Sequence, residues 1–152
     1  MVGGVSRTFA QQTQVLRLVL CVLLLALPTT ACIWRSYADI LSVHVDVVTQ
    51  TAAKLCSVIE AGLGPTAEGM AEYVYPAQRA REFLKQSAGY SERESYKRLG
   101  ELLDRYEAMV RRVDAARANP GETKLDRAAL DADRDGLMRL AEAARIAARD
   151  GR

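Results

Sequence analysis

Histidine, phenylalanine and tryptophan are scarce in this 152-residue sequence, which contains one His, two Phe and one Trp. A single histidine, His44, cannot form a Cys/His zinc set or a histidine-based catalytic triad. The sequence also has no glycine-rich phosphate loop and no nucleophile elbow. It therefore does not predict an enzyme, and we expect His44 to pack at a helix seam.

An excess of charge of one sign is absent as well. The formal net charge is +2, and Arg7 and Arg17 are the only charged side chains before residue 32, so residues 32–152 are neutral overall. Nucleic-acid-binding proteins usually carry a basic face or stripe. We therefore expect no nucleic-acid partner.

Long apolar runs are missing too, because the longest one, LVLCVLLLAL, covers only residues 18–27. A helix that crosses a bilayer needs about 20 apolar residues. The run follows a polar, arginine-containing start and precedes Pro28 and the small residues Thr29, Thr30 and Ala31. This order is typical of a secretory signal peptide, which we predict over residues 1–31.

Cys32 directly follows the predicted cleavage site. The residues before it, with Ala31 adjacent and Thr30 acceptable, resemble the lipobox of bacterial lipoproteins, although Pro28 and Thr29 depart from that pattern. The resemblance implies cleavage before Cys32, transfer of diacylglycerol to its thiol and fatty acylation, for example by palmitate. Ordinary signal peptidase would accept Thr29 and Ala31 and leave Cys32 unmodified, and a retained signal anchor is a third alternative.

The spacing of the cysteines favours lipidation. Cys21 lies in the leader, and Cys32 and Cys56 are 24 residues apart on one predicted helix. That separation is about 36 Å at 1.5 Å per residue, whereas a disulfide needs Cα atoms within about 7 Å. In an oxidising compartment Cys32 would remain an unpaired thiol unless it were acylated. We expect Cys56 to be a small buried residue.

The residue after Cys32 bears on localisation. It is Ile33 and not the aspartate that retains many bacterial lipoproteins at the inner membrane. The resemblance therefore implies a protein anchored in the bacterial cell envelope and facing the periplasm, with the outer membrane favoured.

The remaining chain, residues 32–152, predicts helices over about 34–61, 67–88, 92–118 and 123–149. The first keeps a helical seam through Leu41, Val48 and Leu55, although residues 40–48 also alternate as a strand would. Thr66 is the candidate N-cap of the second helix, and Pro76 predicts a kink in it.

The third predicted helix has the clearest pattern. Ser91 and Glu94 have capping-box spacing, and the inward residues repeat every three or four positions. The pairs Glu94–Arg98, Glu101–Arg105 and Glu107–Arg111 mark its solvated face. The inward stripe of the fourth helix is rich in alanine. Amphipathic helices joined by short turns predict an all-α fold, an antiparallel four-helix bundle after the signal peptide.

The segment DADRDGLMRLAE, residues 131–142, resembles the calcium loop of an EF-hand. The resemblance implies that Asp131, Asp133, Asp135 and Glu142 are ligands, with Gly136 at the turn. The same residues also fit a continuous helix, in which the three aspartates would point in different directions and only Asp133 and Gly136 would break the apolar seam. Calcium is therefore an alternative cofactor, and the main prediction is no cofactor.

These observations favour an exported, lipid-anchored helical protein that acts as a structural or protein-interaction module. We expect the membrane, through the lipid, and a protein partner or a second copy as its partners. A calcium-binding module is one alternative. Another is a small-molecule sensor with tyrosines around a pocket between helices, namely Tyr73, Tyr75, Tyr90, Tyr96 and Tyr106.

Overall fold

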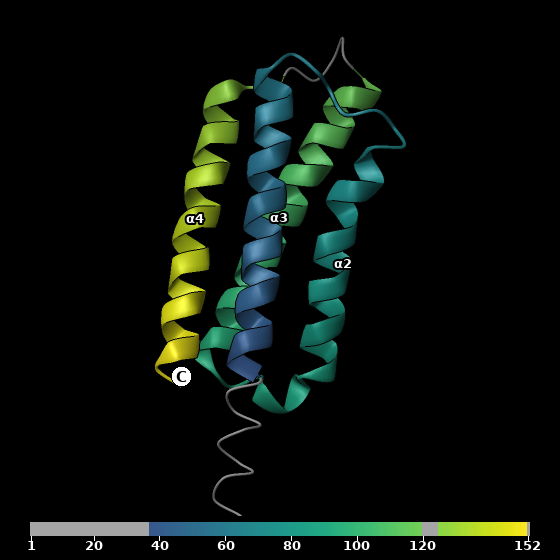
Figure 1. Ribbon diagram of the computed structural model, residues 1–152. Helices are drawn as coiled ribbons and strands as arrows, with labels where there is room; N and C mark the ends of the chain where they lie inside the picture. The colour runs from purple at the N-terminus through teal and green to yellow at the C-terminus, as the bar shows by residue number, and fades with distance from the viewer. Residues whose placement is uncertain (1–36, 120–124, 152) are drawn as a thin grey trace, which may run out of the picture. The chain divides into compact units, whose positions relative to one another are not determined.

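The computed structural model describes residues 37–119 and 125–151. Within these ranges the chain forms four α-helices and no strand, so the predicted all-α bundle is confirmed (Figure 1). The first helix covers residues 37–60, which settles residues 40–48 as helix. It is followed by α2 (Met70–Gln86), the short 3₁₀ helix η1 (Ala88–Tyr90), α3 (Glu94–Ala118) and α4 (Arg127–Arg149). The predicted signal peptide and Cys32 lie outside the described residues.

The first helix ends just before Gly62, whose backbone adopts the left-handed conformation. Gly62 has a φ of 72°. Its amide donates to the Ile59 carbonyl at 2.9 Å, and the Leu63 amide donates to the Val58 carbonyl at 3.0 Å. This pair of bonds is the Schellman motif, which satisfies the last carbonyls of a helix. The motif needs a positive φ at the residue just after the helix, and glycine adopts such a φ without strain.

The other helix ends follow the predicted capping chemistry only in part. The Thr66 hydroxyl accepts a hydrogen bond from the Gly69 amide at 3.0 Å, but α2 itself begins at Met70 and continues through Pro76. The prediction of a capping box at Ser91 is wrong, because the N-cap of α3 is Arg93 and no side chain caps this helix. At α4 the cap is Asp126, whose carboxylate accepts from the Ala128 amide at 3.0 Å, so this helix begins later than residue 123.

The core is built from the apolar stripes of the helices. On the first helix the buried stripe follows Leu41, Val48 and Leu55 as predicted, with Val45 and Ala52 on its flank. The large side chains that are almost completely buried are Leu41, Val45, Val48, Leu55, Leu99, Leu102, Leu103, Tyr106, Met109, Val113 and Leu137. From α4 the buried apolar residues are mainly alanines, so α4 contributes little bulk to this core.

Ion pairs between helices define their order around the bundle. Lys54 on the first helix pairs with Glu72 on α2 at 3.0 Å. Arg81 on α2 donates to Glu107 on α3 at 2.9 and 3.1 Å.

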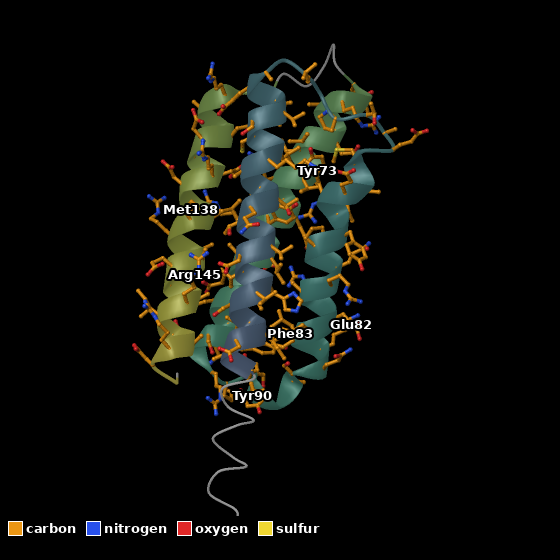
Figure 2. All side chains as sticks on the ribbon, viewed as in Figure 1. Tyr73, Glu82, Phe83, Tyr90, Met138 and Arg145 are labelled. Carbon is orange, nitrogen blue, oxygen red and sulfur yellow. The ribbon has the colours of Figure 1, made fainter. Side chains whose placement is uncertain are left out.

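Two further contacts close the ring. Asp133 on α4 pairs with Arg112 on α3. Arg145 of α4 donates to Asp46 of the first helix at 2.6 Å (Figure 2). Each helix therefore has two neighbours, and α3 lies diagonally across from the first helix. Lys54 near the end of the first helix pairs with Glu72 near the start of α2, and Arg112 in the second half of α3 pairs with Asp133 in the first half of α4, as expected for antiparallel neighbours.

His44 lies between the first helix and α2, as its seam position predicted. Its ring packs on the ring of Phe83, which is labelled in Figure 2, with centroids 4.8 Å apart. Burial lowers the pKa of His44 below its ordinary value of 6.5, and the positive charge of Arg79 lowers that pKa further.

We predict that this lowered pKa makes stability fall in weak acid. As the pH drops through about 6.5, the unfolded chain takes up a proton at His44 before the folded chain does, and the loss levels off below the folded-state pKa. Thermal unfolding from about pH 7.5 to about pH 5 should show a steeper fall for the wild type than for His44→Gln. Parallel pH profiles for the two proteins would contradict this assignment.

Candidate functional site

The segment that resembles a calcium loop is helical throughout, since residues 131–142 all lie within α4. Successive helical residues are rotated by about 100°, so the three aspartates point in different directions. Asp133 is buried toward α3, Asp135 is exposed, and Glu142 pairs with Arg145 at 3.7 Å and with Arg149 at 3.6 Å. The structure therefore has a helix where the EF-hand resemblance implies a loop.

The described residues also contain no group of three or more His, Cys, Asp or Glu side chains placed to hold a metal ion. Asp131, Asp133, Asp135 and Glu142 are not brought together. Calcium binding at this segment stays a prediction that would require α4 to open into a loop.

The two residues that break the apolar seam of α4 have a structural partner on α3. The Asp133 carboxylate binds the Arg112 guanidinium and lies 3.6 Å from that of Arg105. Arg105 also donates to the Ala132 carbonyl at 3.1 Å. We call Arg105, Arg112, Asp133 and Gly136 the α3–α4 clasp. The predicted pair Glu101–Arg105 is wrong, because Arg105 turns to α4 and Glu101 pairs with Arg98 instead.

Gly136 makes the clasp possible. A Cβ atom at this position would lie 2.2 Å from Arg105 Cζ and 2.4 Å from Arg105 Nε, far inside contact distance. The guanidinium therefore packs directly on the backbone of α4. Sequence reasoning missed this cluster, although an Asp and a Gly three residues apart on an otherwise apolar helix face were the signal for it.

We predict that alanine substitution distinguishes this glycine from Gly100 in α3, beside which a Cβ would meet no atom within 4 Å. Gly100→Ala should stabilise the protein by about 0.5–1 kcal/mol, the ordinary helix-propensity gain. Gly136→Ala should raise the free energy of unfolding by less than this, or lower it, because the Arg105 guanidinium must move away from Asp133 and Ala132. Denaturant unfolding measures both effects.

The control is the same substitution without the arginine. In an Arg105→Ala background, Gly136→Ala should stabilise as much as Gly100→Ala does. If Gly136→Ala already gave the full propensity gain in the wild type, the clasp would not constrain this position.

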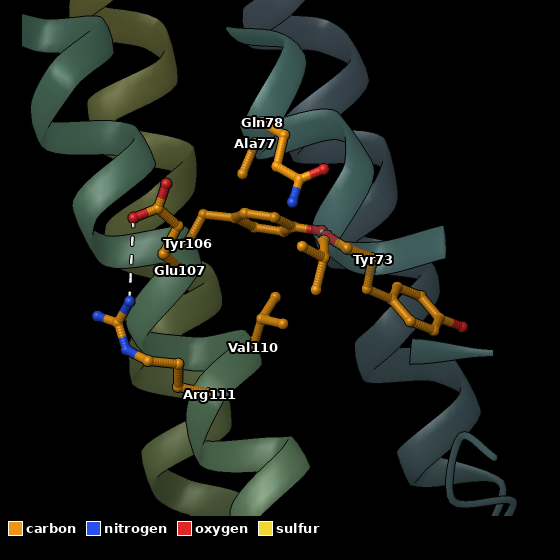
Figure 3. Close-up of a pocket in the computed structure, with 8 residues that line it drawn as sticks. Tyr73, Ala77, Gln78, Tyr106, Glu107, Val110 and Arg111 are labelled. Atoms are coloured by element: carbon orange, nitrogen blue, oxygen red, sulfur yellow. Dashed lines mark hydrogen bonds and ion pairs between the residues drawn. The ribbon is translucent and has the colours of Figure 1, made fainter. Parts of the chain in front are cut away.

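A cavity lies between α2 and α3 (Figure 3). It has a volume of about 200 Å³, opens to solvent and is largely apolar, and we call it the α2–α3 groove. Its lining residues are Tyr73, Val74, Ala77, Gln78, Tyr106, Glu107, Val110 and Arg111. The tyrosine pocket of the sensor alternative is thus present only through Tyr73 and Tyr106, since Tyr75 is exposed and Tyr96 donates to the Leu84 carbonyl.

Tyr106 forms the rigid part of this groove. It is fully buried, and its hydroxyl donates to the Tyr73 carbonyl at 2.6 Å across the two helices. Burial raises the pKa of Tyr106 well above its usual range, and the neighbouring Tyr73 raises that pKa further, so this phenol stays protonated at any physiological pH. It is a fixed structural donor and not an acid or base for chemistry.

The charged edge of the groove is also committed to structure. Arg81 holds Glu107 through two hydrogen bonds, and Arg111 lies 3.9 Å from the same carboxylate. No nucleophile with an adjacent base lines the groove. Its size is below the roughly 300–1,000 Å³ of sites for drug-sized ligands. It can accept one apolar side chain or a fragment of similar size.

Cys56 is the remaining candidate for chemistry. It is buried in the first helix, as the sequence predicted, and burial raises the pKa of its thiol. A protonated, buried thiol is a poor nucleophile.

Comparison with known proteins adds no assignment: no family model, curated protein or solved structure matches this chain. None of the helices in the described part of the chain is long and apolar enough to cross a membrane.

Proposed function

We propose that this chain is an exported helical bundle, anchored to a bacterial envelope membrane through a lipid on Cys32, that acts there as a protein-interaction module. The leader and Cys32 support the anchor. The observation that carries the interaction role is the α2–α3 groove, because it is apolar, open and of side-chain size.

Pockets of this kind suit the anchor residue of a protein partner. Interfaces draw most of their binding energy from a few aromatic or aliphatic side chains that fill such pockets, surrounded by a polar rim. Here Val74, Tyr106 and Val110 supply the apolar walls. The Tyr73 ring points away from the groove, and Gln78 and Arg111 lie at its edge (Figure 3). An enzymatic role has no comparable support, because the ionisable groups of the groove are engaged in structural contacts.

We predict that the mature protein recovered from membranes of a bacterial host begins at Cys32 and carries diacylglycerol. Intact-mass measurement tests this, with Cys32→Ser as the matched variant that should be released or left uncleaved. An unmodified mass starting at Cys32 would mean ordinary secretion. A full-length mass would mean a retained signal anchor, and either result would contradict the lipid.

We predict that a partner contacts the groove in the envelope. A photo-crosslinking amino acid at Gln78 should give an adduct of one discrete mass in the native host, whereas the same amino acid at the exposed Arg139 on α4 should not. Substitution of Val110 by aspartate, at the groove wall, should abolish the adduct.

Circular dichroism of the Val110→Asp variant must show an intact bundle for this comparison to hold. Equal adducts at both positions, or none at Gln78, would contradict an interaction role for the groove.

A further inference from the structure

The first helix exposes an apolar stripe that the bundle does not use. Ile40, Val43 and Val47 are 43%, 58% and 43% exposed. Their spacing of three and four residues places them on one face of the helix. Single exposed apolar residues are ordinary, but three large β-branched side chains in a row form a patch that suggests a contact.

The stripe is confined to the first half of the helix. At the next positions of the same face the side chains are Gln50, Lys54 and Ser57, all exposed, and Lys54 pairs with Glu72. Apolar exposure on this face is thus restricted to the N-terminal half of the helix, which is the half closer to Cys32 in the sequence.

Chain length keeps the stripe close to the proposed anchor. Ile40 is eight positions after Cys32, so their Cα atoms are at most about 28 Å apart even when the chain is fully extended. The other end of the described first helix, residue 60, is 20 residues beyond Ile40 and therefore about 30 Å farther along its axis at 1.5 Å per residue. A lipid on Cys32 therefore keeps the stripe within about 28 Å of the anchor for any conformation of the intervening chain, a shorter tether than that of the Gly62 end.

We propose that Ile40, Val43 and Val47 lie on the phospholipid surface and orient the bundle on the membrane. This inference rests on the proposed anchor at Cys32. Apolar faces of interfacial helices bury about 5–10 Å into the boundary of headgroups and acyl chains. Charges of both signs flank the stripe, for example Asp39 and Lys54, so the contact depends on apolar burial and not on attraction to anionic lipid.

The stripe orients the protein and does not retain it, because diacylglycerol already supplies two chains, which suffice for stable anchoring. With the stripe against lipid, α3 lies on the far side of the bundle, diagonally across from the first helix. The α3 wall of the α2–α3 groove then faces away from the membrane, where a partner can reach it.

An environment-sensitive fluorophore tests the contact. It is attached to Val43→Cys in a Cys56→Ala background of the acylated protein, reconstituted into phosphatidylethanolamine vesicles that carry nitroxide lipids. The matched control is Ile146→Cys, which is 39% exposed and lies in the same half of the bundle, but beside Glu94 and Arg98 of α3. We expect a blue shift and quenching at position 43 and neither at position 146.

The outcomes separate the inference from the anchor on which it rests. A chain that floats with the vesicles but keeps its position-43 probe in water, or shows equal quenching at both positions, overturns the stripe contact alone. A chain that does not float overturns the anchor and the contact together. A blue shift at position 43 without vesicles that grows with protein concentration would mean that a second copy covers the stripe, which also overturns the contact.

Discussion

The arrangement of α4 depends on one interaction, the ion pair between the buried Asp133 carboxylate and Arg112. Arg105 lies beside the same carboxylate. The inward stripe of α4 is mostly alanine, and small identical side chains could pack against α3 in several registers with similar burial. A carboxylate at the same interface tolerates no such freedom, because an unpaired buried charge costs several kcal/mol. We infer that the clasp selects the register and that the alanines allow the close approach.

The same logic extends around the bundle. Each of the four interfaces between neighbouring helices carries an ion pair, from Lys54–Glu72 to Arg145–Asp46. Exposed pairs contribute little stability individually. At each seam, however, a charged pair fixes which residues face one another, and the groove lined by Tyr106 and Val110 follows from the register of α2 against α3. The functional surface is thus a consequence of packing rather than a separate motif.

Much of the fold could be predicted from the sequence because the helices are strongly periodic. On α3 the predicted repeat of three or four positions is found in the buried side chains, among them Leu99, Leu103, Tyr106 and Val113. The first residue of each helix is harder to predict. A side chain that can cap a helix, such as that of Ser91, does so only if the preceding turn places it at the N-cap. On the first helix the buried stripe is wider than the predicted seam, because Val45 and Ala52 are buried as well. Periodicity predicts where a stripe lies but not its width.

The candidate sites show what sequence reasoning leaves undecided. The calcium-loop pattern fits the spacing of Asp131, Asp133, Asp135 and Glu142. It contains no information about Arg105 and Arg112 on α3, which pair with Asp133. The groove was invisible in the sequence because its walls come from α2 and α3, whose relative register depends on contacts such as Arg81 with Glu107. The lipid anchor, by contrast, is predicted from a local sequence pattern that ends at Cys32. It stays a proposal, which the intact mass of the mature protein tests.

Backbone chemical shifts of residues 131–142, measured by NMR with and without millimolar calcium, test the clasp most directly. The account predicts helical Cα shifts through Asp133 and Gly136 under both conditions, with calcium causing no change. Loop-type shifts in this segment, or a large displacement of the Gly136 amide resonance on adding calcium, would contradict it and make these carboxylates a metal site.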